Sequence, residues 1–548
     1  MNDKLTTKQL WWLIIVAAVI WFSNLEYRTL VKPDEGRYAE IPREMVKSGD
    51  WTTPRLNELK YFEKPPLQYW ATAVAYTVFG EHQWTSRLWA GLTGFAGILL
   101  VWFAGLRLFG REAADYAAML LGSSLLYVLI GHINTLDMGV TFFITLGIFA
   151  LLLGQSETDE KKRRNWMLLA WAGMALAVLS KGLMGLILPG TAVLIYCALQ
   201  RDLTVLKRMH WLPGLAVFFL IVTPWFYLVM KANPEFFEKF FIYEHYTRFI
   251  TKDLGRYQPW YYFVPILLSG ALPWTVLMFD SVLRAWRDGG RADKAFSPER
   301  FLMIWAVFIY LFFSVSGSKL PSYLLPMFPA LALLMGQRMV KIRGRVLMWQ
   351  LVPVIPVLLV LIVAAANIGR FADTPLQAEL YPQYAVWLIS GVSILLSGVL
   401  LAIWLLKRER KLTAVVLLAF STLLCAQISL SGYNTIANER SAKHIAAAIK
   451  DYVKPDIVFY SVLDYEQTLP FYIKHTFTLV QYDDEMGFGI KQEPQKAIAT
   501  LAGFAQAWRS QSQALAIMPV YAYPLAQQLG IEMNIIYRDT QYIVVKKP

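Results

Sequence analysis

The chain has 548 residues, of which 56% are hydrophobic, 15% aromatic and only 17% charged. A soluble globule of this length could not bury so much apolar surface. The mean hydropathy of +0.42 and repeated apolar runs of about twenty residues, enough to cross a hydrocarbon core of about 30 Å, indicate a polytopic membrane protein. The net charge of +13 does not indicate nucleic-acid binding, because most cations flank the apolar runs. Cys197 and Cys425 lie in separate apolar runs, which excludes a disulfide framework and a cysteine-based zinc site.

Thirteen apolar runs are long enough to cross a membrane. They lie near residues 9–25, 84–108, 113–131, 135–154, 166–180, 182–199, 212–230, 261–282, 300–316, 321–338, 346–366, 384–406 and 412–431. No small-x-small cleavage site follows the first run, which indicates an uncleaved span. Cations concentrate in alternate connections, such as Lys161–Arg164 and Lys407–Lys411, so the positive-inside rule predicts a cytoplasmic N-terminus. An odd number of spans then places the C-terminus outside.

The spans leave two long outer loops and an outer C-terminal domain. We expect residues 1–433 to form the transmembrane body, with outer loops at 26–83 and 231–260. The first loop ends in an apolar stretch too short to span, which predicts a segment lying in the membrane interface. Residues 434–548 alternate β-rich runs with helical patterns. The predicted fold class is therefore an all-α polytopic membrane protein with about thirteen transmembrane helices and a small outer α/β domain.

Two motifs in the first outer loop carry most of its charge. Residues 32–45 alternate carboxylates with guanidiniums, including Asp34 and Arg37, in a loop punctuated by proline and glycine. Such a set can bind a phosphate and a hydroxylated or charged sugar together; a solvated loop whose charges pair with one another is the alternative. In residues 61–70, Lys64 precedes two prolines that fix its backbone. A lysine about 4 Å from a phosphate is attracted by about 4 kcal/mol at an effective dielectric of about 20, and snorkelling to lipid headgroups is the alternative.

Further charged residues lie at the outer ends of later spans. Asp137 begins an otherwise apolar span, where a carboxylate usually faces a polar cavity or a cation; a helix cap is the alternative. Lys181 and Lys319 occupy comparable positions, where simple anchoring at the interface is the alternative. In the outer loop after the seventh span, His245 and Arg248 lie among several aromatic residues that suit contact with phosphate and a sugar ring.

The sequence contains few motifs that would indicate binding of a metal ion or a nucleotide. A divalent cation bound by His245 and Glu63 is the one metal site that we consider, although a lone histidine is more often structural. The sequence contains no HxH, HExxH, CxxC or GxGxxG motif and no phosphate-loop lysine. Nucleotide cofactors and ATP-driven transport therefore lack support.

The acidic first outer loop, the many-span body and the small outer domain resemble the glycosyltransferase C superfamily, whose members use polyprenyl-phosphate sugar donors. Within it, residues 34–45 and 62–67 are similar to the bacterial 4-amino-4-deoxy-L-arabinose transferases that modify lipid A. The resemblance covers essentially the whole chain. It implies undecaprenyl phosphate aminoarabinose as donor and lipid A phosphate as acceptor. It also implies a multi-pass enzyme of the bacterial inner membrane with periplasmic active site and C-terminal domain, and resistance to polymyxin and cationic peptides.

The resemblance also assigns roles to individual residues. Asp34 and Asp137 take the positions of the catalytic carboxylates. Substrate contacts are expected from Arg37, Tyr38, Tyr61, Glu63, Lys64, Arg248 and Tyr323. We expect no required cofactor, because the donor carries its own leaving group and the acceptor phosphate, with a second pKa of about 6, is already largely ionised; a divalent cation remains the alternative.

Other functions are compatible with parts of the pattern. A related transferase could use another sugar or a protein acceptor. A lipid transporter would be expected to place ionisable groups or broken helices near the middle of the membrane. Here the charges gather at the outer ends of the spans, which favours chemistry at one surface over transport or a purely structural role.

Overall fold

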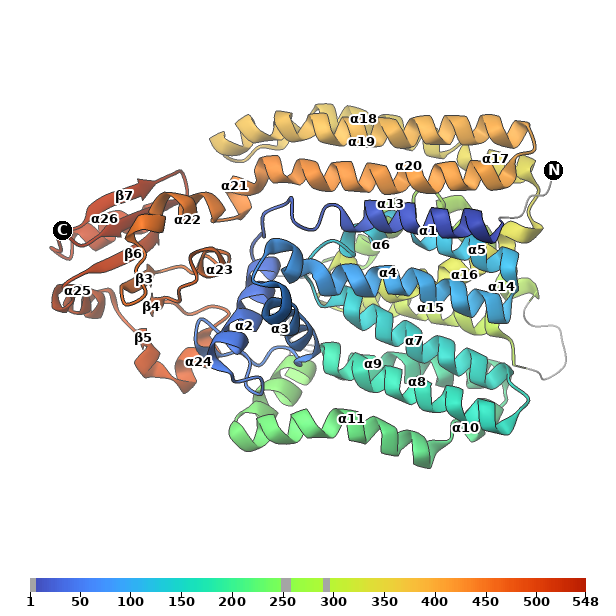
Figure 1. Ribbon diagram of the computed structural model, residues 1–548, viewed down its shortest axis with the longest axis horizontal. Helices are drawn as coiled ribbons and strands as arrows, with labels where there is room; N and C mark the ends of the chain where they lie inside the picture. The colour runs from blue at the N-terminus through green and yellow to red at the C-terminus, as the bar shows by residue number, and fades with distance from the viewer. Residues whose placement is uncertain (1–5, 248–257, 289–295) are drawn as a thin grey trace.

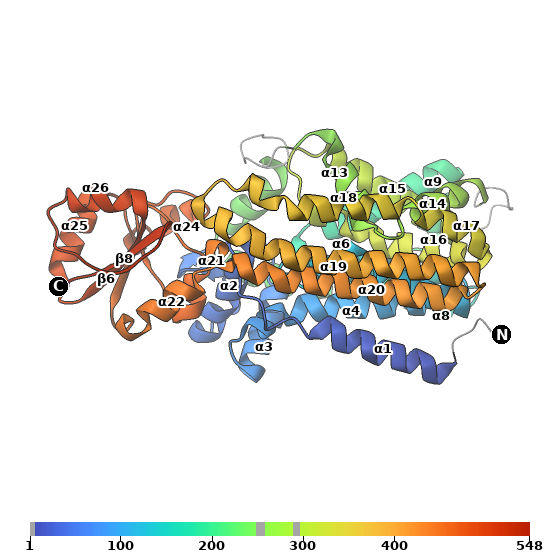
Figure 2. The same cartoon turned by 90° about the horizontal axis from the view of Figure 1, so that it is seen from above.

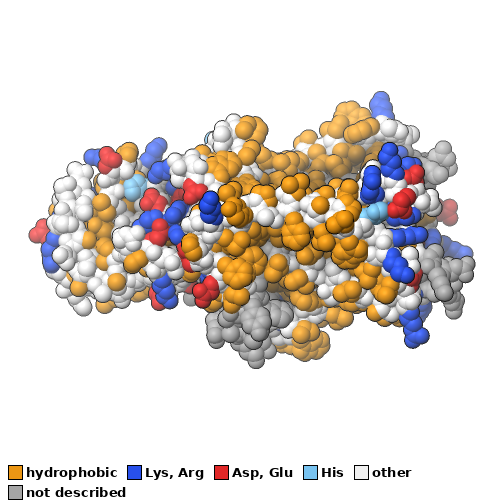
Figure 3. Space-filling view, turned by 90° about the horizontal axis from the view of Figure 1, so that it is seen from below, with side chains coloured by type: hydrophobic (Ala, Val, Ile, Leu, Met, Phe, Trp, Pro, Cys, Tyr) orange, Lys and Arg blue, Asp and Glu red, His pale blue; other side chains and the backbone are white. Residues whose placement is uncertain are grey.

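The computed structural model describes residues 6–247, 258–288 and 296–548, without the side chains of residues 245–247. A long body of roughly aligned helices carries the C-terminal domain at one end (Figures 1 and 2). The first helix begins at the opposite end of this body, so the two ends of the described chain lie far apart. A broad hydrophobic surface covers the helical body, as a membrane protein requires (Figure 3).

The helices of the body overlap the thirteen predicted runs, three of which contain two helices each. In chain order they are α1 (Thr7–Phe22), α4 (Gln83–Leu108), α5 (Arg111–Leu121), α6 (Leu125–Ile130), α7 (Asp137–Ser156), α8 (Glu160–Lys181), α9 (Met184–Gln200), α11 (Trp211–Ala232), α13 (Phe263–Gly270), α14 (Thr275–Asp288), α15 (Pro298–Val315), α16 (Phe328–Lys341), α17 (Gly344–Leu351), α18 (Val354–Ala366), α19 (Pro375–Lys407) and α20 (Lys411–Gly432). Within the described residues, eight helices are long and apolar enough to span a membrane, or nine if one bent pair is a single span. The multi-pass membrane fold is thus confirmed.

Several predicted spans are shorter or less regular than expected. The run at 261–282 is not straight, because α13 and α14 meet at 110°. Pro273 lies in the break, and a proline cannot donate a helical hydrogen bond. The run at 113–131 is also divided, between α5 and α6, and α1 and α9 have only 16 and 17 residues. Such breaks do not lower the mean hydropathy of a run much, so the sequence predicts a single span across each of them.

Close helix contacts in the body depend on small residues. A Cβ atom on Gly173 of α8 would lie 2.7 Å from the backbone nitrogen of Gly147 in α7. Such contacts between small residues let two membrane helices pack backbone against backbone. They hold together the two helices whose outer ends carry Asp137 and Lys181.

The first outer loop is more helical than predicted. Residues 34–48 form helix α2 (Asp34–Ser48) instead of a loop, and they are followed by the hairpin β1 (Arg55–Leu56) and β2 (Leu59–Lys60) and by α3 (Leu67–Phe79). Asp34 and Glu35 lie in the first turn of α2, where carboxylates are favoured by the helix dipole. In the 13-residue α3, Val78 and Phe79 are exposed, and the position of this segment in the membrane interface stays a prediction.

The C-terminal domain is built on one six-stranded sheet. Its strands are β3 (Val458–Val462), β4 (Thr478–Val480), β5 (Ala497–Ile498), β6 (Ala514–Pro519), β7 (Asn534–Arg538) and β8 (Tyr542–Lys546), in the order β5-β4-β3-β6-β8-β7. The strands β3 to β6 are parallel, and β8 pairs antiparallel with β6 and β7. The helices are α21 (Ala437–Arg440), α22 (Lys443–Ile449), α23 (Leu469–Ile473), α24 (Gly487–Gln492), α25 (Leu501–Ser510) and α26 (Tyr523–Gln527). Strands alternate with helices along the domain, as the predicted mixture of β-rich runs and helical patterns indicates, and β5 has only two residues.

The C-terminal domain packs directly on α2. A Cβ atom on Gly36 would lie only 2.5 Å from the carbonyl oxygen of Gln467, in the loop that follows β3. The backbone nitrogen of Lys32 donates to the carbonyl of Arg440 at 2.8 Å. Since parallel strands present their following loops at one edge of the sheet, this edge is brought against the helix that carries Asp34 and Arg37.

Candidate functional site

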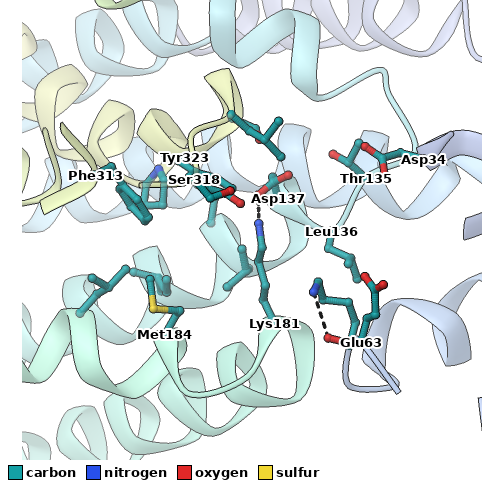
Figure 4. A pocket seen from close by; sticks show the side chains of 18 of the residues that line it. Asp34, Glu63, Thr135, Leu136, Asp137, Lys181, Met184, Phe313, Ser318 and Tyr323 are labelled. Atoms are coloured by element: carbon teal, nitrogen blue, oxygen red, sulfur yellow. Dashed lines mark hydrogen bonds and ion pairs between the residues drawn. The ribbon is translucent and has the colours of Figure 1, made fainter. Parts of the chain in front are cut away.

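A cavity of about 220 Å³ lies where the first outer loop meets the outer ends of the body helices (Figure 4). Polar side chains come from α2, the segment before α3, and the facing ends of α7 and α8. Apolar side chains from α7, α9 and α15, together with residues of the segment 316–326, line most of the remainder. The lining residues are Asp34, Arg37, Tyr38, Glu63, Lys64, Thr135, Leu136, Asp137, Val140, Thr141, Ile144, Lys181, Met184, Leu188, Glu244, Phe312, Phe313, Ser316, Ser318, Leu320, Ser322, Tyr323 and Pro326. A charged end beside an apolar wall suits a ligand with a polar head and a lipid tail.

Arg37 is the centre of the charged end. Its guanidinium lies 3.4 Å from Asp34, 3.8 Å from Glu63 and 3.1 Å from Glu485, and it donates a 2.7 Å hydrogen bond to the Tyr61 hydroxyl. Burial lowers the pKa of Arg37, but Tyr61 and the carboxylates outweigh this and raise it well above its usual value. Asp34 is 40% exposed, so this carboxylate is open to a ligand while its cation is buried.

Asp137 and Lys181 form an ion pair across the cavity (Figure 4). Asp137 is the first residue of α7, and the N-cap residue Leu136 makes no side-chain capping hydrogen bond. The Lys181 ammonium also lies 4.8 Å from the ring centroid of Tyr323. Asp137 therefore binds the Lys181 ammonium inside the cavity, and Lys181 points into the site rather than toward the membrane surface.

Glu63 and Lys64 line the cavity from the segment that precedes α3. The Lys64 ammonium donates a 2.9 Å hydrogen bond to the Glu63 carbonyl. The two prolines that follow restrict the backbone between this pair and α3, which begins at Leu67. The sequence motif thus places one carboxylate and one ammonium at the rim of the site.

The structure brings most of the predicted residues together. Asp34, Arg37, Tyr38, Glu63, Lys64, Asp137 and Tyr323 line the cavity, and Tyr61 adjoins it through Arg37. Lys319 instead donates to backbone carbonyls of Ser316 and Gln258, so it stabilises the loop between α15 and α16. The roles of the cavity residues in substrate binding or catalysis stay predictions.

Two predicted site residues cannot be compared with the structure. Arg248, a predicted substrate contact, lies outside the described residues, and so does the side chain of His245, one half of the predicted metal pair. Among the residues that the structure describes, no group of three or more His, Cys, Asp or Glu side chains could hold a metal ion. Binding of a divalent cation by Glu63 and His245 therefore stays a prediction.

Two acidic residues of the site were not predicted. Glu485 reaches Arg37 from the loop after β4. Burial raises the pKa of Glu485 above its usual value, although Arg37 opposes this effect. Glu244 lines the cavity and forms a 3.0 Å ion pair with Lys239. In the sequence, the only local signal for Glu485 is the acidic run at 483–485, which follows a strand.

Comparisons with known proteins agree with this architecture. A family described as "Aminoarabinose transferase C-terminal domain" matches residues 445–547, and one described as "Dolichyl-phosphate-mannose-protein mannosyltransferase" matches residues 63–228. The apo oligosaccharyltransferase of Archaeoglobus fulgidus has a similar fold at 12% identity, with a TM-score of 0.52 over 94% of this chain and 70% of that chain. The fold and the position of the cavity define a membrane protein of the glycosyltransferase C type.

More similar relatives identify the family. Undecaprenyl phosphate-alpha-4-amino-4-deoxy-L-arabinose arabinosyl transferases of Erwinia tasmaniensis and Proteus mirabilis are 36% and 32% identical, over 60% and 63% of this chain. These alignments span about three fifths of the relatives, 58% and 62% of their lengths. The crystal structure of ArnT from Cupriavidus metallidurans bound to undecaprenyl phosphate is 36% identical, with a TM-score of 0.93 over 99% of this chain and 98% of that chain. The chain belongs to the ArnT family of aminoarabinose transferases.

Proposed function

We propose that this protein transfers 4-amino-4-deoxy-L-arabinose from undecaprenyl phosphate to phosphate groups of lipid A. The observation that carries the proposal is the match, over nearly the whole chain, to an ArnT solved with undecaprenyl phosphate. The cavity supports it, because Arg37, Lys64 and Lys181 surround a space that also has an apolar wall. Three cations suit a lipid phosphate, and the wall suits its hydrocarbon chain.

In the proposed reaction, an acceptor phosphate oxygen attacks the anomeric carbon of the donor sugar. The bond from this carbon to the lipid phosphate oxygen breaks, and the phosphate leaves with the electron pair. Cations that face the phosphate stabilise the charge that develops on it, a role we assign to Lys64 and Arg37. Asp34 orients the acceptor or accepts its residual proton, and it stabilises the positive charge that develops at the sugar ring.

Asp137 has two candidate roles in this reaction. Its ion pair with Lys181 supports a role in holding that cation toward the donor phosphate. Binding of the ammonium group of the sugar is the second role. Holding both lipids in one cavity adds proximity, which lowers the barrier by several kcal/mol or more.

We place this reaction at the periplasmic face of the bacterial inner membrane, where it gives resistance to polymyxin and cationic peptides. It requires no cofactor, since both leaving group and nucleophile are phosphates. Chelation of divalent cations should therefore leave transfer by the purified protein unchanged. Loss of transfer on chelation, restored by one added cation, would support the metal alternative instead.

Mass spectrometry of lipid A from cells with and without this protein tests the proposed function. We expect lipid A that carries aminoarabinose only when the protein is present. Unmodified lipid A, together with a newly glycosylated protein or another lipid, would favour a related transferase. Unchanged covalent structures of all these molecules would contradict an enzymatic role.

A further inference from the structure

Asn134 lies at the junction of the three segments that carry the charges of the site. Its backbone N–H donates a 3.0 Å hydrogen bond to Glu35 of α2. Its side-chain carbonyl accepts a 2.9 Å hydrogen bond from the amide of Gln68 in α3. Each of these three residues is only 1% exposed. Because buried hydrogen bonds of this kind are costly to lose, they fix the segments relative to one another.

Each contact of Asn134 is close to a charged residue of the cavity. Glu35 directly follows Asp34, and Asn134 lies three residues before Asp137, the first residue of α7. Gln68 follows Lys64 after two prolines, which make the connecting backbone stiff. A shift of Gln68 is therefore transmitted to Lys64, and a shift of Asn134 is transmitted to Asp137.

Arg87 of α4 holds Glu35, the α2 residue of this junction, in place. The Arg87 guanidinium binds Glu35 through hydrogen bonds of 2.7 and 2.8 Å, and it also donates to the carbonyl of Leu25. Burial raises the pKa of Glu35, but Arg87 outweighs it and lowers the pKa, so Glu35 stays an anionic acceptor. Arg28 donates to the carbonyl of His132, two residues before Asn134. The segment before α7 is thus held at two points, whereas the start of α3 is joined to it through Gln68.

We propose that Gln68 and Asn134 are positioning residues, whose buried hydrogen bond fixes Lys64 relative to the Asp137–Lys181 ion pair so that the two lysines face one donor phosphate. The inference rests on the proposed function of the same cavity. Neither residue lines the cavity itself, so both act through the charged residues beside them. A displacement of about 1 Å at a reacting group can cost about 100-fold in rate.

A double-mutant cycle in the full-length protein, in lipid nanodiscs, tests the inference with undecaprenyl phosphate as the probe. Gln68→Met keeps the size of the side chain and removes the amide. We expect it to weaken undecaprenyl phosphate binding and to lower kcat/KM by about 10- to 100-fold per folded molecule. In a Lys64→Ala background the same change should alter binding by less than about twofold, because Gln68 acts through Lys64.

Thr72→Val is the matched control. Thr72 lies one turn further along the buried face of α3, and its hydroxyl makes no hydrogen bond within the described part of the chain. This variant should bind and transfer like the wild type. Should Gln68→Met fail to accumulate, Gln68→Asn tests the same link, since it keeps the amide but withdraws it from Asn134 by one methylene.

The outcomes separate this inference from the proposed function. Folded Gln68→Met protein that binds and transfers normally would overturn the inference, as would an equal loss of binding with and without Lys64. Wild-type protein that binds undecaprenyl phosphate but never modifies lipid A would contradict the proposed acceptor, while the binding cycle would still decide the positioning role. Wild-type protein that does not bind undecaprenyl phosphate would overturn both.

Discussion

At the residue scale, the two predicted catalytic carboxylates share one cavity but have different partners. Asp34 lies 3.4 Å from Arg37 and keeps 40% of its side chain exposed. Asp137 is largely buried and forms an ion pair with Lys181. Asp34 is therefore the carboxylate that an incoming sugar or acceptor can reach, while Asp137 holds a lysine in position.

Asp34→Asn should leave the protein folded and lower transfer by at least about 100-fold, because it removes one charge at nearly constant shape. Aminoarabinose on lipid A and turnover by purified protein are the measurements. Asp50→Asn is a matched control in the same outer loop, since Asp50 accepts from the backbone nitrogens of Thr52 and Thr53 and an asparagine oxygen can do the same. Wild-type turnover by Asp34→Asn would contradict its catalytic assignment.

Asp137→Asn separates a structural cap from a role in the site. Asparagine caps helices about as well as aspartate, so a cap would lose only a few tenths of a kcal/mol. In the observed site, the change leaves the Lys181 ammonium without its counter-charge. We expect a strong loss of transfer at normal expression and thermal stability. Normal transfer by a well-expressed variant would show that the carboxylate is only part of the helix start.

At the element scale, the sequence predicted elements well where a single pattern determined them. The body helices follow from apolar runs, and the residues of α2, the segment before α3, and α7 could be assigned to one site because all lie at outer ends of spans. The helical state of α2 was missed, because Pro42 and Gly36 suggested a loop. Glu485 could not be predicted at Arg37, since their contact depends on how the C-terminal domain packs on α2.

The packing of the C-terminal domain on α2 makes Gly36→Ala a test of that interface. The added methyl group would lie 2.5 Å from the carbonyl oxygen of Gln467, a backbone atom that cannot turn aside. We expect a loss of about 1–3 kcal/mol in stability, measured as a lower thermal midpoint and faster proteolysis of residues 434–548.

Gly190→Ala in α9 is the control for this change, because a Cβ atom there would meet nothing within 4 Å. This variant should be unchanged or more stable by up to about 1 kcal/mol, the helix propensity gained over glycine. Equal stability of the Gly36→Ala protein and the wild type would show that the interface moves apart without cost.

The β7–β8 turn of the C-terminal domain provides a test in acid. Burial raises the pKa of Asp539, but hydrogen bonds from His444 and from the backbone of Tyr542 lower it to about 2. A carboxyl with a lowered pKa stabilises the folded state above its unfolded pKa of about 4, and this contribution is lost as the pH falls through about 2. Asp539→Asn should therefore cost about 1–2 kcal/mol at pH 7 and progressively less between pH 4 and pH 2.

Hydrogen exchange in peptides that cover β7 and β8 of the full chain, corrected for the intrinsic rate at each pH, measures this effect. His444→Gln should give a smaller loss at pH 7, because the backbone hydrogen bonds to Asp539 remain. A difference between Asp539→Asn and wild type that did not depend on pH would contradict an ionised carboxylate in the folded domain.

At the scale of the whole molecule, the basic side chains and the cavity lie at different ends of the helical body. Lys and Arg side chains gather at the end of the helical body away from the C-terminal domain, beyond a hydrophobic surface (Figure 3). The basic residues at this end include Lys161–Arg164 in the first turns of α8 and Lys407–Lys411 at the junction of α19 and α20. The cavity lies at the opposite end, beside the C-terminal domain. By the positive-inside rule, we expect the basic end to be cytoplasmic, which supports the proposed periplasmic position of the cavity.

Reporter fusions test this orientation directly. A phosphatase that is active only outside the cytoplasm should be active when it is fused after Gly432, where α20 ends beside the C-terminal domain. The same reporter should be inactive within Lys161–Arg164, and a reporter that is active only in the cytoplasm should give the opposite result at both positions. Because the start of α8 and the end of α20 lie at opposite ends of the helical body (Figure 1), the two positions must report opposite sides. The reverse pattern would move Asp34 and its cavity to the cytoplasm, and a lipid A acceptor that waits in the periplasm could then not reach the site.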